Sequence, residues 1–155
     1  MPKNARWILA GFAGLVVVVA VVYLLTAAVP GGGVAAGLDP GDSGKVALGA
    51  RIYAEHCASC HGESLEGQAN WRQRGPDGRL PAPPHDASGH TWHHSGEQLF
   101  ALTKYGPATL AGGGYESDMP AYEGTLGDAE IWAVLSYIKS RWPAEIRARH
   151  DRIGK

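Results

Sequence analysis

The apolar residues of this chain are distributed unevenly, and the first block of them is continuous. Trp7 to Val29 is almost unbroken apolar sequence, and no charged residue occurs between Trp7 and Leu38. As a helix, these 23 residues would be roughly 35 Å long, enough to cross a hydrocarbon core of about 30 Å. Residues 1–29 are therefore predicted to form a transmembrane anchor. A cleaved signal peptide is the alternative, although its apolar region is usually about 7–15 residues long.

The charges on either side of this segment predict its orientation. Lys3 and Arg6 precede it, whereas the first charged residue after it is Asp39. The positive-inside rule then places the N-terminus in the cytoplasm and the rest of the chain in the periplasm, on the outer face of the cytoplasmic membrane. Residues 30–44 have glycine at six positions and no periodic pattern, which predicts a flexible linker.

After the linker, three segments carry apolar residues at helical spacing, and each has a start signal. They are 45 to the first cysteine, 95–106 and 125–143. The predicted caps are Asp42 or Ser43 for the first, Ser95 with Gln98 for the second and Thr125 with Asp128 for the third. Gly106 and Pro143 are the expected stops of the second and third helices. No alternating pattern predicts a strand, so the expected fold class is all-α.

The two long stretches between these helices, 62–89 and 107–124, have no periodic pattern and need an organiser other than backbone pairing. The sequence Cys57-Ala58-Ser59-Cys60-His61 contains both cysteines of the chain and matches the motif of c-type haem attachment. Each thiol adds to one vinyl group of the porphyrin, and the spacing lets the chain reach both. The following histidine then lies beneath the iron as an axial ligand.

Three other uses of the cysteine pair need to be weighed. A disulfide across so short a loop would contribute little stability. A redox dithiol of the thioredoxin type needs a βαβ context, which the pattern lacks. A zinc site would need Cys57 and Cys60 with His90 and His93 or His94, at a separation that matches no common zinc module. Haem attachment also agrees with the predicted outer-face location, and we expect one covalently attached haem c.

A second axial ligand is expected at Met119. The only other methionine is Met1, which the topology places on the opposite side of the membrane. Met119 lies between Asp118 and Pro120 in a polar loop, where core packing gives little reason for a methionine.

These motifs together resemble the class I c-type cytochromes, here with an N-terminal membrane anchor. The resemblance covers residues 45–143 as a haem domain and leaves 144–155 as a charged C-terminal tail that contains His150. It implies that Gly49 and Tyr53 of the first helix cross the last helix near Leu135 and Trp132 or Ile138. It also implies that the carbonyl of Pro84 (or Pro83) accepts a hydrogen bond from His61. His85 departs from the family, which usually has leucine there.

The segment 68–94 is longer than the minimal loop of that family. Its Trp71 and Arg72, with Arg74 and Trp92, are candidates to cover the haem edge and pair with the propionates, because a guanidinium suits a carboxylate. Its His90, His93 and His94 are alternatively a copper-type metal site or ordinary surface residues.

The expected function is single-electron transfer, not catalysis, because two axial ligands leave no position on the iron for a substrate. The expected partners are redox proteins or membrane complexes, and the lipid bilayer through the anchor. A net charge of -1 gives no reason to expect nucleic-acid binding. The alternatives are a cytochrome subunit of a larger membrane complex, an enzyme with a labile sixth haem ligand, and a metal-handling protein that uses the histidine cluster.

Overall fold

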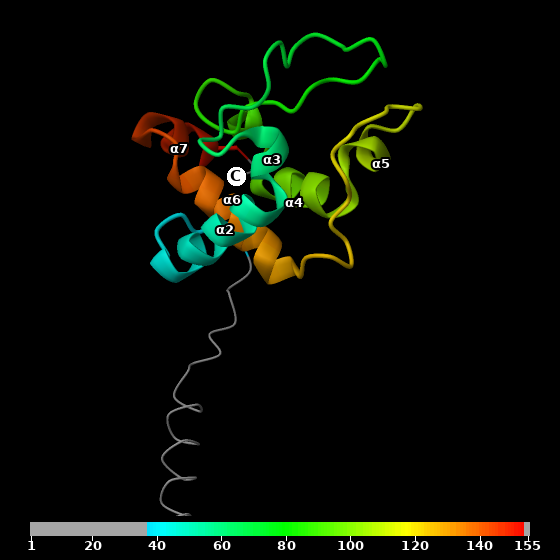
Figure 1. The fold of residues 1–155 in the computed structure, drawn as a ribbon. Coiled ribbons are helices and arrows are strands. Elements are labelled where there is room, and N and C mark those ends of the chain that lie inside the picture. The colour runs from blue at the N-terminus through cyan, green and yellow to red at the C-terminus, as the bar shows by residue number, and fades with distance from the viewer. Residues whose placement is uncertain (1–36, 154–155) are drawn as a thin grey trace, which may run out of the picture. The chain divides into compact units, whose positions relative to one another are not determined.

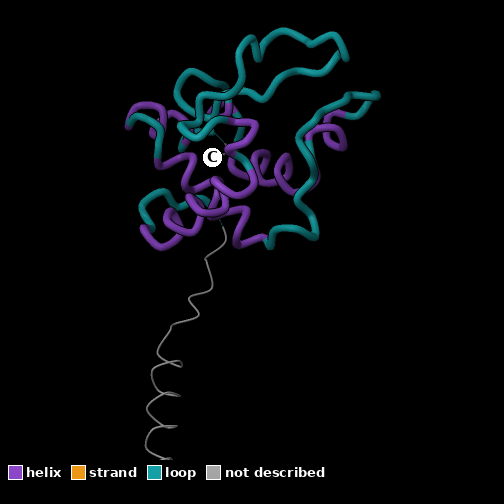
Figure 2. The backbone as a smooth tube through the Cα atoms, viewed as in Figure 1, coloured by secondary structure: helices purple, strands orange, loops and turns teal. Residues whose placement is uncertain are grey.

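All the regular secondary structure in the described part of the chain is helical. The computed structural model describes residues 37–153, and these contain helices and loops but no strand (Figure 2). This confirms the all-α prediction. The predicted anchor, residues 1–29, and the first part of the predicted linker, residues 30–36, lie outside the described residues. Within residues 37–153, no helix is both long and apolar enough to cross a bilayer. The helices are α2 (Ser43–His56), α3 (Ala58–His61), the 3-10 turn η1 (Thr91–His93), α4 (Gly96–Tyr105), α5 (Pro107–Ala111), α6 (Asp128–Ser140) and α7 (Ala144–His150).

The first two predicted helix starts are confirmed. The Asp42 side chain accepts a hydrogen bond from the backbone N–H of Lys45 at 3.0 Å and caps α2. In α4, Ser95 and Gln98 form a reciprocal capping box, and Gly106 ends the helix with φ 80°. The side chains of Asp42 and Ser95 accept hydrogen bonds from N–H groups that have no partner within the helix. Gly106 adopts the positive φ that suits the end of a helix.

The start of the third helix was predicted two residues too early. Helix α6 begins at Asp128 with Gly127 as its N-cap, and the Glu130 carboxylate accepts from the Gly127 N–H at 2.8 Å. The N–H groups of Thr125 and Leu126 instead donate to the Tyr122 carbonyl at 2.9 Å and make a turn. The carboxylate at the third helical position therefore selects the helix start, and Thr125 does not cap it.

The predicted tail contains a further short helix, α7, that packs on the domain. Helix α6 ends at Ser140, and Pro143 is the N-cap of α7. His150 is 3% exposed, and its ring lies 5.1 Å from that of Trp142, centroid to centroid. Arg147 donates to the carbonyls of Trp142 and Ser140, at 2.5 and 3.3 Å. The predicted charged tail is therefore partly helical, and its His150 is buried.

Helix α2 crosses α6 at a point where the two backbones approach closely (Figure 1). A Cβ at Gly49 would lie 2.5 Å from the carbonyl carbon of Ala133 and 2.9 Å from Cβ of Tyr137. One turn on, the Tyr53 ring meets the Tyr137 ring at 5.4 Å. Gly49 and Tyr53 were predicted at this crossing, whereas the contacts with Ala133 and Tyr137 were not.

The residues predicted as those partners have other neighbours. Trp132 stacks on Phe100 of α4 at 4.6 Å between ring centroids. Leu135 and Ile138 line a cavity on another side of α6. Helix α6 is therefore buried on several sides, and it is the element around which α2 and α4 pack.

Candidate functional site

A cavity of about 470 Å³ opens between the helices and the two long loops. This volume is within the range of cofactor pockets, about 300–1,000 Å³. Its wall is mostly apolar, which excludes water from whatever occupies it. The apolar lining comes from the loop before η1, from α4 and from α6: Leu80, Pro81, Leu99, Leu102, Val134, Leu135 and Ile138.

The cysteine motif forms one short helical turn at the wall of this cavity. Cys57 ends α2 by donating its N–H to the Tyr53 carbonyl at 2.9 Å, and α3 then carries Cys60 and His61. Both cysteines are free thiols and both line the cavity. The disulfide alternative is therefore wrong for this structure. Burial, with a smaller contribution from Cys60, raises the pKa of Cys57 to about 11, so its thiol is protonated near neutral pH.

His61 is held by one ring nitrogen, which leaves the other free. Its Nδ1 lies 2.8 Å from the carbonyl oxygen of Pro83, and the side chain is buried. A carbonyl only accepts, so Nδ1 carries the proton and Nε2 presents its lone pair. Burial lowers the pKa of His61, although the Pro83 contact opposes this. The ring is thus oriented and neutral, as a metal-ligating histidine has to be.

The partner of His61 is Pro83 and not Pro84, the first choice from the sequence. The Pro84 carbonyl instead accepts from the Thr91 hydroxyl at 3.4 Å. Two glycines allow the backbone to pack closely here. A Cβ at Gly67 would lie 2.7 Å from the Pro83 carbonyl carbon, and one at Gly89 would lie 2.7 Å from the Pro84 carbonyl carbon. The two successive carbonyls thus have different partners, His61 for Pro83 and Thr91 for Pro84.

His85 covers the face of His61, which the sequence did not predict. The two rings stack at 3.9 Å between centroids with an interplanar angle of 22°. His85 Nδ1 lies 2.8 Å from the Thr91 hydroxyl oxygen, and its carbonyl accepts from Trp142 Nε1 at 2.7 Å. Burial, and then the proximity of His61 and His90, lowers the pKa of His85 well below its usual value. The His85 ring is therefore neutral and stacks on His61, at the position where the family usually has leucine.

Met119 lines the same cavity from the loop between α5 and α6. It is half-buried and packs against the hydrophobic core, and its N–H donates to the Ser117 hydroxyl at 3.2 Å. The structure therefore brings Cys57, Cys60, His61 and Met119 together around one space.

Tyr122 joins the far end of this loop to the cysteine motif. Its hydroxyl donates to the His56 carbonyl at 2.6 Å, and both residues line the cavity. Burial raises the pKa of Tyr122 to about 12, so the phenol remains a donor. This contact was not predicted, because a tyrosine in a loop carries no signal for a partner so distant in sequence.

Trp71 and Arg72 do not line the cavity, so the predicted propionate contact is not supported. Trp71 stacks on His90 at 5.3 Å between ring centroids, and the Arg72 guanidinium lies 4.0 Å over Trp71. A second stack joins Trp92 to His93 at 3.8 Å. These aromatic and cationic groups therefore contact one another, and none of Trp71, Arg72, Trp92 and His93 lines the cavity.

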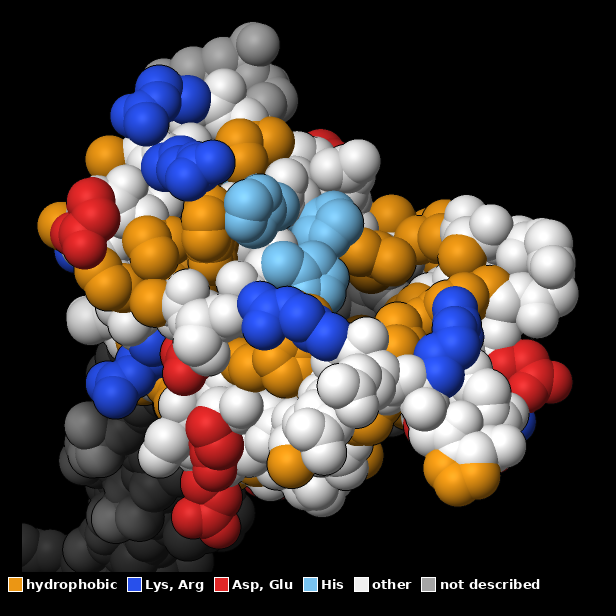
Figure 3. Space-filling model, turned by 90° about the horizontal axis from the view of Figure 1, so that it is seen from above, with side chains coloured by type: hydrophobic (Ala, Val, Ile, Leu, Met, Phe, Trp, Pro, Cys, Tyr) orange, Lys and Arg blue, Asp and Glu red, His pale blue; other side chains and the backbone are white. Residues whose placement is uncertain are grey.

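Figure 3 shows His side chains gathered on one face of the molecule, beside Lys and Arg side chains. The rings of His90 and His94 lie edge to face at 5.5 Å. Over residues 37–153, however, no three His, Cys, Asp or Glu side chains are arranged to hold a metal ion. The zinc and copper alternatives therefore find no site in the described part of the chain.

Comparisons with known proteins agree with this geometry. Residues 46–142 match the family model for cytochrome c. A relative, the cbb3-type cytochrome c oxidase subunit CcoP of Azospirillum sp. (strain B510), is 34% identical over 97 residues. The match covers 63% of this chain but only 29% of that subunit, so this chain corresponds to less than a third of the relative's length. No solved structure matches the chain.

Proposed function

The chain belongs to the cytochrome c family, and from this premise we propose that it is a membrane-anchored monohaem cytochrome that transfers single electrons. The family implies a covalently bound haem c, and the single cysteine motif supports one attachment site. Electron transfer is the role the family supports. The anchor, the outer-face location and the absence of catalysis are the further parts of the proposal.

One observation carries the proposal, namely that the cavity residues fit this cofactor. Two free thiols, a histidine with a fixed tautomer and a methionine sulfur all line one apolar cavity, although they come from separate segments. Thiols suit vinyl addition, and imidazole with thioether suits an axial pair.

When bound, the haem supplies one-electron chemistry at its iron. Around it, Cys57 and Cys60 would hold the porphyrin, while His61 and Met119 would be the axial ligands. The Pro83 carbonyl orients the imidazole and fixes its tautomer. Leucine, valine and isoleucine side chains of α4 and α6 keep water away, which favours the less charged reduced state.

The N-terminal sequence supports the proposed location. Residues 1–29 would anchor the domain in the cytoplasmic membrane, and 30–44 would tether it at the outer face. A tether keeps the effective concentration of the haem domain high at membrane-bound donors and acceptors. Redox proteins or membrane complexes would be the partners.

A second candidate is that the chain is a cytochrome subunit of a larger membrane complex. The similarity to CcoP, a subunit of an oxidase, favours it. Purification of the anchored chain in mild detergent separates the two. Stoichiometric co-purification with other membrane subunits supports the complex, and a chain that remains alone supports the free carrier.

The absorption spectrum of the haem-loaded full chain tests the proposal. We expect one covalent haem and the far-red charge-transfer band of Met-ligated ferric haem. Met119→Ala should abolish this band and let the iron bind exogenous ligands. Leu110→Ala, which changes an exposed side chain on α5, is the matched control and should retain the band. Survival of the band in Met119→Ala would show that the sixth ligand is another residue.

A further inference from the structure

The segment 112–121, which carries Met119, lies between α5 and the anchored Tyr122, and its ion pairs to the rest of the domain all end on one side chain. Residues 112–121 make only two internal hydrogen bonds, from the Tyr115 N–H to the Gly112 carbonyl and from the Met119 N–H to Ser117. Within the described chain, every hydrogen bond or ion pair that connects this loop to another segment ends on Arg79. The other restraints are packing of Met119 against the core, the Arg74 guanidinium at 5.6 Å from the Tyr115 ring, and the attachment of Tyr122 just beyond the segment.

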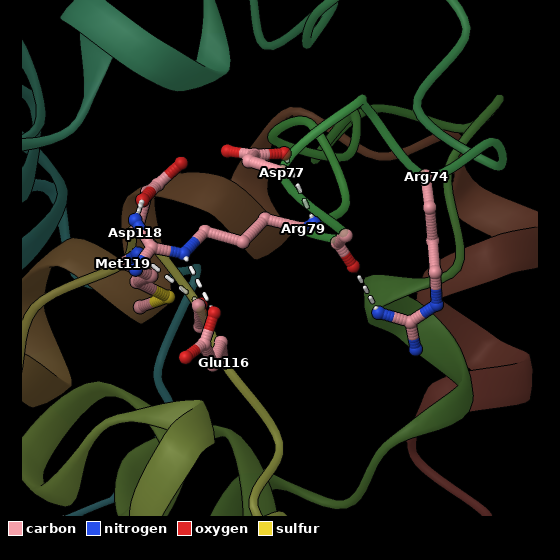
Figure 4. A network of polar contacts seen from close by, with 8 residues as sticks. Arg74, Asp77, Arg79, Glu116, Asp118 and Met119 are labelled. Carbon is pink, nitrogen blue, oxygen red and sulfur yellow. Dashed lines mark hydrogen bonds and ion pairs between the residues drawn. The ribbon is translucent and has the colours of Figure 1, made fainter.

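Arg79 reaches two carboxylates of that loop (Figure 4). Its Nη1 donates to Asp118 Oδ1 at 2.6 Å, and its Nε lies 3.5 Å from Glu116 Oε2. Asp118 immediately precedes Met119, and it lines the cavity as Met119 does. A carboxylate held here therefore fixes the backbone on one side of the methionine.

Arg79 is itself held in a tight turn. Its N–H donates to Asp77 Oδ1 at 3.1 Å, and its carbonyl accepts from the Gly75 N–H at 2.8 Å. The next residues along the chain, Leu80 and Pro81, line the cavity. The guanidinium thus bridges two loops that both border the cofactor space, and no backbone hydrogen bond between those loops duplicates it.

We propose that Arg79 is a positioning residue for the sixth haem ligand, which holds the Met119 loop closed through Asp118 and Glu116. This rests on the proposed function, because it assumes that Met119 ligates the iron. An exogenous ligand can bind only when the methionine has left, so its apparent affinity is proportional to the open fraction of the protein. Loss of the contacts of Arg79 with Asp118 and Glu116, which we call the latch, raises the open fraction. It does not change the iron site that the open protein presents to imidazole.

Imidazole binding to the ferric, haem-loaded full chain measures the open fraction. Exposed ion pairs are individually weak, so Arg79→Gln should tighten the apparent dissociation constant by about 2- to 10-fold. Arg72→Gln is the matched control, since Arg72 lies in the same loop over Trp71 and touches no residue of the Met119 loop. It should bind imidazole as the unsubstituted chain does.

Salt and a second substitution sharpen the test. High salt screens exposed charges, so it should tighten imidazole binding in the unsubstituted chain more than in Arg79→Gln. Asp118→Asn should have an effect similar to that of Arg79→Gln. In the double variant, the fold-change in the imidazole dissociation constant should be smaller than the product of the two single fold-changes. Hydrogen exchange in residues 112–118 should accelerate in both single variants and not in Arg72→Gln.

The outcomes separate the latch from the proposed function. Equal imidazole affinity for Arg79→Gln and Arg72→Gln, in a protein whose far-red band depends on Met119, overturns the latch alone. A band that is absent from the unsubstituted chain, or unaffected by Met119→Ala, overturns the ligand assignment. Additive effects of the two latch substitutions would show that Arg79 and Asp118 act separately and would also overturn the pairing.

Discussion

Gly49 is the position where the crossing of α2 and α6 is most sensitive to one added carbon. A Cβ there would lie 2.5 Å from the Ala133 carbonyl carbon, whereas ordinary contact begins at 3.4 Å. The added Cβ would thus lie 0.9 Å closer to this carbon than ordinary contact allows, and the Ala133 carbonyl oxygen would lie closer still. Both atoms belong to the backbone, so no change of side-chain rotamer relieves the clash. In Gly49→Ala the helices must separate, and such overpacking costs about 1–3 kcal/mol or more. The helix propensity of alanine returns about 1 kcal/mol.

We therefore expect Gly49→Ala to lower the free energy of unfolding by about 2 kcal/mol, because rigid backbone places the steric cost at the upper end of its range. Urea denaturation of the haem-loaded chain, followed by far-UV circular dichroism, measures this. Ala54→Gly, at an exposed site of the same helix, calibrates the propensity term and should cost about 1 kcal/mol. A Gly49→Ala protein as stable as the unsubstituted chain would refute the close crossing.

Two further substitutions test contacts at the cavity wall. Burial lowers the pKa of His85, so the folded state keeps this ring neutral while the unfolded chain gains a proton below about pH 6.5. The stability that the neutral ring contributes is therefore present above that pH and lost as the pH falls. In His85→Leu, the urea midpoint should decline less steeply as the solution is made acidic, and an unchanged slope contradicts this. Tyr122→Phe leaves the His56 carbonyl without its donor and should cost about 1–2 kcal/mol in the same assay. Tyr105→Phe, at an exposed ring, should cost nearly nothing, and equal losses in the two variants would refute the role of the hydroxyl.

The features that the sequence predicted are those with a signal spanning a few residues. The caps at Asp42 and Ser95 and the stop at Gly106 are decided within one helical turn, and the structure confirms them. The cysteine motif is equally local, since the thiols and His61 need only one turn of chain to reach the same cavity. Met119 was identified by elimination, because the chain has only one other methionine.

The features that were missed depend on groups brought together from distant segments. Pro83 and Pro84 are alike in sequence, and which of the two carbonyls faces His61 depends on how the folded loop packs. Helix α7 is short and charged, so its pattern did not reveal that His150 packs on Trp142. Trp71 stacks on His90 and lies beneath the Arg72 guanidinium, contacts that its residue type alone does not indicate.

The division between these two groups has a physical basis in how the site is built. The side of the cavity that carries His61 is held by helix α3, by the Pro83 carbonyl and by the stacked His85. Residues 112–121, which carry Met119, have no regular structure and depend on Arg79 for their ion pairs to other segments, whereas the chain is anchored again at Tyr122. A methionine on this segment would hold a haem iron less firmly than a histidine on the turn of α3 would. Conditions that weaken exposed ion pairs, salt above all, should therefore act on the Met119 side first and leave the His61 side unchanged.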